Sequence, residues 1–122
     1  MKDAIETLLT RRSVRNFNGK PIPEDVLDTI LKVGTYAPTA KGMQKPVIIA
    51  IKDKKVRDEL AALNAKIMGR EGVDPFYGAP VVILVAVEKY DLSVYDGASV
   101  IANMLDAAWA LGVGSCWVHR AK

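Results

Sequence analysis

The segment from about Val94 to Leu111 constrains the fold most, because it reads as a helix that is apolar on almost every side. A narrow polar edge lies at Asn103 and Asp106. The apolar positions include Val100, Ile101, Met104, Leu105, Ala107, Ala108, Trp109 and Leu111. Such a helix must be buried on most sides. We therefore predict a long helix over 94–111 that lies in the core or against another subunit.

Three further helices are predicted from capping residues and from apolar residues at helical spacing. Asp3 can cap the first and Asp53 the third. Pro23 lies just ahead of the second, and Pro38 ends it, because a residue before proline is pushed out of the helical region. The apolar positions are Ile5, Leu8 and Leu9 in the first helix, Val26, Leu27, Ile30 and Leu31 in the second, and Val56, Leu60, Leu63 and Ile67, which we expect to be buried, in the third.

Three short segments predict strands, at 47–51, 81–87 and 115–118. The second is apolar without alternation, which is typical of a strand covered on both faces, so we expect it in the middle of a sheet. Gly112 and Gly114 turn the chain into the third. The predicted fold class is α+β, a small mixed or antiparallel sheet wrapped by helices, in one domain over 1–122. Three strands leave an exposed edge, which a second copy of the chain can complete.

Composition excludes several classes of function. The net charge of +3 is modest and the basic residues are dispersed among acids after the first cluster, so no nucleic-acid partner is expected. A single cysteine, Cys116, and a single histidine, His119, speak against a disulfide framework and a metal site. The first residues carry charges where a signal peptide is apolar, and no apolar run reaches the ~18 to 20 residues of a membrane span. We expect a cytoplasmic protein without a membrane partner.

Two segments together suggest a phosphorylated, ring-bearing cofactor. Where the first helix ends, Arg11, Arg12, Ser13 and Arg15 gather charge and a hydroxyl that can hold a phosphate. After the second helix, the turn Pro38–Thr39–Ala40 leads to Gln44, whose amide can meet a flat polar ring. The first segment can also be a solvated basic helix end that complements the helix dipole. The second can be an ordinary helix stop followed by a surface amide.

The order of these motifs resembles the flavin-dependent nitroreductase family. The matching segments are Arg11-Arg12-Ser13-x-Arg15, Ala37-Pro38-Thr39-Ala40 with Gln44, Ala79-Pro80 before an apolar strand, and Gly112-Val113-Gly114-Ser115-Cys116-Trp117. The resemblance covers essentially the whole sequence. It implies FMN as cofactor and a homodimer with FMN at the interface, in which segment 94–111 supplies much of the subunit contact.

The resemblance also implies roles for individual residues. Arg11 and Ser13 would bind the FMN phosphate, and Arg15 would lie near the N1–C2=O side of the ring, where a guanidinium stabilises reduced flavin. The turn with Pro38, Thr39, Ala40 and Gln44 would come from the partner subunit. Asn64 would lie against the flavin, although an asparagine on an amphipathic helix is most often a polar-face residue. Trp117, Val118 and His119 would face the N5 and O4 edge, with His119 either a proton donor or a surface residue at a chain end.

Some positions depart from the commonest family pattern. Lys41 and Gly42 replace its spacer and asparagine, and Val47 follows Pro46 where the family has tryptophan. Cofactor binding is still expected despite these changes, but they leave the substrate preference open. Family members also continue through a further helix, a last strand and a C-terminal arm, so we expect the C-terminal part of the fold to be absent from this sequence.

The function implied is a two-electron oxidoreductase in which NAD(P)H reduces FMN and an electron-poor acceptor, such as a nitroaromatic or a quinone, then takes the electrons. No side chain has to be an obligatory acid or base. Two alternatives stay open: a flavin-binding module without turnover, and a cofactor-free interaction domain.

Overall fold

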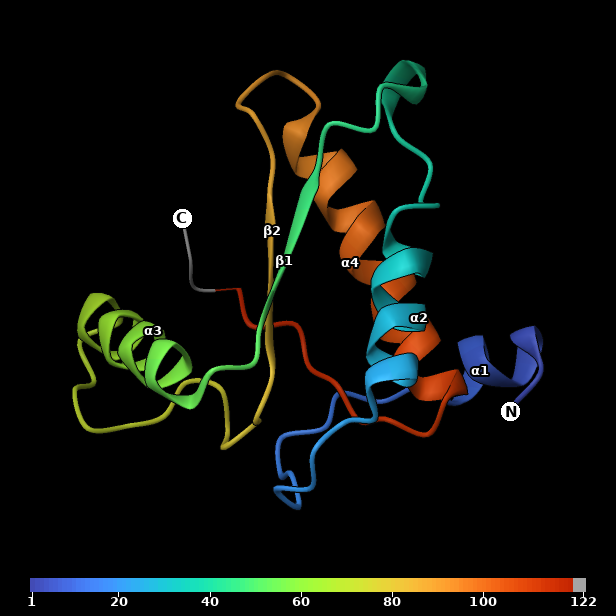
Figure 1. Ribbon diagram of the computed structural model, residues 1–122. Helices are drawn as coiled ribbons and strands as arrows, with labels where there is room; N and C mark the ends of the chain where they lie inside the picture. Colours follow the sequence, from blue (N-terminus) through green and yellow to red (C-terminus); the bar gives the residue numbers. More distant parts are fainter. Residues whose placement is uncertain (120–122) are drawn as a thin grey trace.

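The computed structural model describes residues 1–119, which form four α-helices, one 3-10 turn and a two-stranded sheet. In chain order these are α1 (Ala4–Thr10), α2 (Glu24–Gly34), the 3-10 turn η1 (Ala40–Gly42), β1 (Val47–Ile51), α3 (Lys54–Ile67), β2 (Val82–Ala86) and α4 (Ser93–Ala110). In Figure 1, α2 and α4 lie side by side along the sheet, and α3 lies on the other side of it. The predicted α+β class is confirmed.

The two strands pair antiparallel, with Val47 opposite Ala86 and Ile51 opposite Val82. The prediction of a third strand at 115–118 is wrong, because Ser115 makes only a single parallel bridge, to Ser13. The prediction that 81–87 lies in the middle of a sheet is also wrong within residues 1–119, where β2 has β1 as its only strand neighbour. One edge of β2 is therefore unpaired within the described residues.

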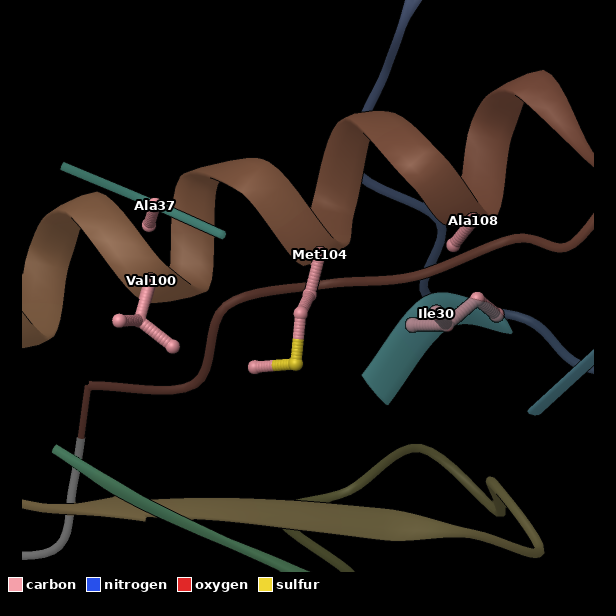
Figure 2. Packing of buried hydrophobic residues seen from close by; sticks show 5 residues of the cluster. All are labelled: Ile30, Ala37, Val100, Met104 and Ala108. Atoms are coloured by element: carbon pink, nitrogen blue, oxygen red, sulfur yellow. The ribbon is translucent and has the colours of Figure 1, made fainter. Parts of the chain in front are cut away.

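The main core lies between α2, α4 and the sheet. Figure 2 shows its buried residues, Ile30, Ala37, Val100, Met104 and Ala108. Gly34 allows the closest approach there: a Cβ at this position would lie 2.7 Å from Ile48 Cδ1 and 2.8 Å from Met104 Cγ. The long helix predicted over 94–111 is confirmed as α4, although Val94 and Tyr95 at its start are exposed.

Helix α1 packs on α4 through its polar side. Asp3 caps it as predicted, accepting a hydrogen bond from Glu6 N at 2.8 Å. Trp109 Nε1 of α4 donates to Thr10 Oγ1 at 2.9 Å. The apolar face is left bare, with exposed fractions of 66% at Ile5, 61% at Leu8 and 71% at Leu9. The face of α1 that could bury the most apolar area therefore has no partner within residues 1–119.

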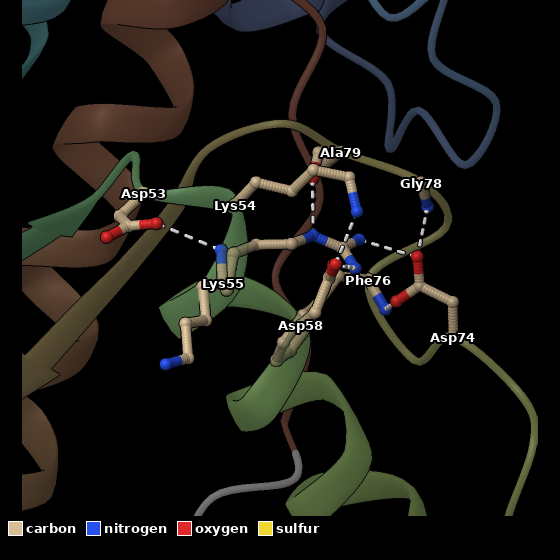
Figure 3. A network of polar contacts seen from close by, with 9 residues as sticks. Asp53, Lys54, Lys55, Asp58, Asp74, Phe76, Gly78 and Ala79 are labelled. Carbon is tan, nitrogen blue, oxygen red and sulfur yellow. Dashed lines mark hydrogen bonds and ion pairs between the residues drawn. The ribbon is translucent and has the colours of Figure 1, made fainter.

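Helix α3 buries a different face from the predicted one. Asp53 caps it as expected, but Val56, Leu63 and Ile67 are exposed, and the buried positions are Arg57, Ala61, Asn64 and Ala65. The reason lies in the loop after α3, which folds back over this side of the helix. Arg57 Nε donates to Ala79 O at 2.8 Å, Arg57 Nη2 donates to Asp74 Oδ2 at 2.5 Å, and the guanidinium lies 5.6 Å from the Phe76 ring centroid. Figure 3 shows Asp74, Gly78 and Ala79 gathered around this contact.

Within residues 1–119, no helix is both long enough and apolar enough to span a bilayer.

Candidate functional site

The basic segment predicted as a phosphate site follows directly from the end of α1. Arg11 is the C-cap, and its Nε lies 3.8 Å from Asp106 Oδ1 of α4. Arg12 folds back on the helix end, where its Nη1 donates to Arg11 O at 2.9 Å and to Leu9 O at 3.3 Å. Ser13 and Arg15 are exposed. The three arginines are thus not equivalent: Arg12 caps carbonyl groups, Arg11 lies near an acid, and Arg15 points to solvent-accessible space.

Segment 113–119 lies beside this basic segment. Val14 N donates to Ser115 O at 2.9 Å, and a Cβ on Gly114 would lie 3.0 Å from the Val14 side chain, so a glycine lets the two segments approach. The hydroxyl of Ser115 is buried and has no hydrogen-bond partner. An unpaired buried hydroxyl is costly, and an ordered water or a bound group can satisfy it. The sequence did not predict a role for Ser115 itself. Its position becomes notable only in the structure, where it follows Gly114 and lies beside the basic segment.

A cavity of about 1160 Å³ opens next to these two segments. It is lined by residues of α2, α3, β2 and α4 and of the segments 16–23, 76–81 and 111–119. Among the predicted site residues, those that line it are Asn64, Trp117, Val118 and His119. Asn64 is only 4% exposed, and its Nδ2 donates to Leu60 O at 3.0 Å. The Trp117 and His119 rings meet edge to face, with centroids 6.2 Å apart. Asn16 and Phe17 also line the cavity and were missed, although they directly follow the basic motif.

The turn from Pro38 to Gln44 is closed by its own side chains. Gln44 Nε2 donates to Thr35 O at 2.8 Å and to Ala37 O at 3.3 Å, and its Oε1 accepts from the Thr39 hydroxyl. Gln44 N in turn donates to Thr39 Oγ1 at 3.0 Å. Lys41 and Gln44 have positive φ, 54° and 49°, which these bonds hold in place. The Gln44 amide therefore satisfies the end of α2 rather than presenting itself outward.

The basic segment and this turn lie at different levels of α4. Ala40 N donates to Asp96 Oδ1 at 2.9 Å, near the start of α4, whereas Arg11 lies near Asp106, ten residues further along. At 1.5 Å per residue, these two levels are about 15 Å apart. The structure thus brings segment 11–15 together with segment 113–119, and keeps the turn with Pro38, Thr39, Ala40 and Gln44 at a distance from both within one chain.

Asp96 is a buried acid that sequence reasoning missed. It is 4% exposed and also accepts a hydrogen bond from the Tyr90 hydroxyl. This hydrogen bond raises the pKa of Tyr90 to about 12. The sequence signal is its helical spacing from Ser99, Asn103 and Asp106, which places it on the polar edge of this helical stretch.

Comparison with known proteins identifies the family. The nitroreductase family model matches residues 8–121. The chain belongs to the nitroreductase family. A crystal structure of a nitroreductase with bound FMN from Bacteroides fragilis superposes with a TM-score of 0.90 at 29% identity, covering 98% of this chain and 71% of that one.

Two curated relatives match over nearly the whole chain. A protein named as an NADH dehydrogenase/NAD(P)H nitroreductase of Archaeoglobus fulgidus is 28% identical over 97% of this chain and 68% of its own length. An FMN reductase (NADPH) of Bacillus subtilis is 27% identical over 97% of this chain. The chain spans 54% of that relative, so it corresponds to about half of it.

The residues present fit a flavin mononucleotide. A phosphate needs donors, and Arg11 at the end of α1 and the exposed Ser13 supply them beside Ser115, whose hydroxyl is unpaired. A flat aromatic ring needs a mostly apolar space with a few polar groups, and the cavity beside that place offers one, with the Asn64 amide in its wall.

Proposed function

We propose that this nitroreductase-family protein is an FMN-dependent oxidoreductase that passes two electrons from NAD(P)H to an electron-poor acceptor such as a nitroaromatic or a quinone. The observation that carries the proposal is the pairing of segment 11–15 with segment 113–119 at the edge of the cavity. It places exposed basic groups and an unpaired hydroxyl next to an apolar space. FMN, when bound, supplies the chemistry of accepting and releasing the electron pair.

The side chains of this protein then bind and orient. Arg11 and Ser13 hold the phosphate, with Arg12 fixing the helix end from which they project. The family resemblance assigns Arg15 to the side of the ring that becomes negative on reduction, and its exposure leaves it able to turn toward a bound group. Trp117, Val118 and His119 border the ring together with Asn64. None of these side chains has to act as an obligatory acid or base.

We further propose that the working site is built from two copies of the chain. The turn with Pro38 to Gln44 lies about 15 Å from the basic segment along α4, so in one chain it is placed away from the cofactor's phosphate end. In a homodimer the partner's turn can complete the site. The bare apolar face of α1, with Ile5, Leu8 and Leu9, supports such an assembly, because burying these three side chains is favourable.

The test is a two-step spectroscopic titration of the purified protein. FMN is added first, and binding is followed by the change in flavin absorbance and fluorescence. NADH or NADPH is then added without oxygen, followed by a nitroaromatic or a quinone. We expect stoichiometric FMN binding, loss of the yellow colour with at least one nicotinamide, and its return with the acceptor.

Each outcome of this titration selects one function. A protein that binds FMN but is reduced by neither nicotinamide is a flavin-binding module without this turnover. A protein that binds no FMN leaves the cofactor-free interaction domain as the alternative, with the bare α1 face as its candidate contact surface. Either result contradicts the proposed oxidoreductase.

A further inference from the structure

The polar edge of α4, formed by Asp96, Ser99, Asn103 and Asp106, contacts a different segment at each position. Asp96 accepts from Ala40 N at 2.9 Å, and Ser99 Oγ donates to Pro38 O at 3.0 Å. Asn103 Nδ2 donates to Val33 O at 3.4 Å, and Asp106 lies 3.8 Å from Arg11 Nε. The spacing of three and four residues keeps all four on one side of the helix.

Asp96 is the residue of this edge for which the contact matters most, because it alone of the four is buried. It is 4% exposed, and both of its carboxylate oxygens accept hydrogen bonds, one from the Ala40 amide and one from the Tyr90 hydroxyl. Burying a carboxylate is costly, and here neutral donors offset the cost, helped by its place in the first turn of α4, at the positive end of the helix dipole. Removing either oxygen leaves a half-buried donor without its partner.

The turn itself needs an outside contact to fix where it lies. The bonds of Gln44 and Thr39 close the turn locally, within residues 35–44. Ala37 packs in the main core just before the turn, and the hydrogen bonds that join the turn itself to the rest of the fold come from α4, through Asp96 at Ala40 and Ser99 at Pro38. Local bonds set the shape of the turn, and these two contacts set its position and direction.

We propose that Asp96 is a positioning residue that holds the Pro38–Gln44 turn in the place from which it contacts the cofactor. This inference rests on the proposed function, because it gives the turn a role at the FMN site. Asp96 itself touches no cofactor in this scheme. It acts through the Ala40 amide, so what matters is an acceptor oxygen at this point rather than its negative charge.

The experiment compares Asp96→Ala with Asp96→Asn and with Asn103→Ala. Asparagine keeps an acceptor for Ala40 N and removes the charge. Asn103→Ala is the matched control, because it removes a hydrogen bond from the same edge of α4 to the body of α2 rather than to the turn. Two quantities are measured: the dissociation constant for FMN by fluorescence titration, and hydrogen exchange of peptides covering residues 36–46 without FMN.

We expect Asp96→Ala to raise the FMN dissociation constant tenfold or more and to speed exchange in residues 36–46. Asp96→Asn should restore both to within about threefold of wild type, and Asn103→Ala should leave FMN affinity within about twofold. A role in general stability alone predicts that Asp96→Ala and Asn103→Ala act alike on the turn and on FMN. That result, or wild-type exchange and affinity in Asp96→Ala, overturns the inference.

Ala40→Pro serves where Asp96→Ala does not fold. Proline removes the donor N–H and leaves Asp96 and the core unchanged, and Thr39, with φ −132° and ψ 162°, already has the extended backbone that a residue before proline prefers. Faster exchange and weaker FMN binding in Ala40→Pro support the inference, and wild-type behaviour overturns it. If the wild type itself binds no FMN, the proposed function fails and the cofactor role of Asp96 falls with it. If the wild type binds FMN and Asp96→Ala binds it equally well, only this inference fails.

Discussion

At the scale of single residues, the three arginines of the basic segment look alike in the sequence but make different contacts in the structure. Arg12 is occupied by carbonyl groups at the end of α1, and Arg11 shares its position with Asp106. Arg15 is exposed. Replacing an arginine should therefore change the free energy by a different amount at each of these three positions.

Arg11→Ala should weaken FMN binding by about 1.5 to 3 kcal/mol, the scale of a lost charged hydrogen bond to phosphate. Fluorescence titration measures this. Lys32→Ala, an exposed lysine in the last turn of α2, is the control for loss of one positive charge. Equal affinities of Arg11→Ala and wild type would remove Arg11 from the phosphate site.

Arg15→Gln should keep the oxidised FMN complex and lower its midpoint potential. A cation near the ring stabilises the reduced, more negative state more than the oxidised one. At roughly 1.4 kcal/mol per 30 mV, one partly solvated charge accounts for some tens of millivolts. A dye-coupled redox titration with saturating FMN gives the value for wild type and variant. An unchanged potential would place Arg15 at the phosphate or on the surface.

Local chemistry made some residues predictable and others not. The caps Asp3 and Asp53 were predictable because capping depends on the next two or three residues alone. The inward use of the Gln44 amide was not, because it depends on how the chain folds back on the end of α2. Asp96 was missed because its partner, Ala40, lies 56 residues away in the sequence.

At the scale of elements, the packing of α2 against α4 and β1 depends on Gly34. Gly34→Ala should lower the free energy of unfolding by about 1 kcal/mol or more, because the added Cβ overlaps Ile48 and Met104, and overpacking of this kind costs about 1 to 3 kcal/mol. The matched control is Gly97→Ala in α4, where the nearest atom is 3.3 Å away and helix propensity favours alanine by about 1 kcal/mol. Urea unfolding followed by circular dichroism measures both. Equal stabilities of the two variants would contradict the close approach at Gly34.

Because of the loop after α3, the free energy of unfolding should decrease at acidic pH. Burial raises the pKa of Asp74, but the hydrogen bonds from Arg57, Phe76 N and Gly78 N outweigh burial and hold it below its ordinary value of 3.8. A carboxylate with a lowered folded-state pKa stabilises the fold above its unfolded pKa, and that stability is lost as the pH falls through the folded value.

Wild type should therefore lose more stability between pH 7 and pH 3 than Asp74→Asn does, as read from urea midpoints at the two pH values. Asp91→Asn, in an exposed loop, is the control. A parallel loss in wild type and Asp74→Asn would show that this contact does not contribute to the acid response.

The errors at this scale have a common cause. The helical spacing of α3 predicted an apolar buried face, but Arg57 is drawn inward by a loop that begins after the helix ends. Segment 115–118 has a strand-like composition, yet its hydrogen-bond partner is the backbone at Ser13 and Val14. In both cases the deciding contact is distant in the sequence, and local patterns do not contain it.

At the scale of the whole molecule, the fold class could be predicted because four helical segments and two apolar strands are each strongly patterned. The sequence could not predict which of the candidate cofactor segments meet within one chain. The family motifs give their order in the sequence, whereas their separation along α4 appears only when the helix is packed.

If two chains form the site, dimerisation and FMN binding must be linked. Dilution should release FMN and produce monomers over the same range of concentration. Leu8→Lys, which places a charge on the bare face of α1, should weaken both, and Lys66→Ala on α3 is the control. Sedimentation velocity followed at a flavin wavelength measures mass and bound FMN together. A monomer that keeps one FMN per chain would contradict the two-chain site.

The four contacts along the polar edge of α4 also limit how the gene can change length. Each residue advances the helix by about 100° and 1.5 Å, so one inserted residue between Ser99 and Asn103 would swing Asp106 away from Arg11 while leaving Asp96 at Ala40. Seven inserted residues would nearly restore the phase but add about 10 Å between the two contacts. Within this stretch, substitutions can be absorbed one at a time, whereas insertions and deletions disturb every contact that follows them.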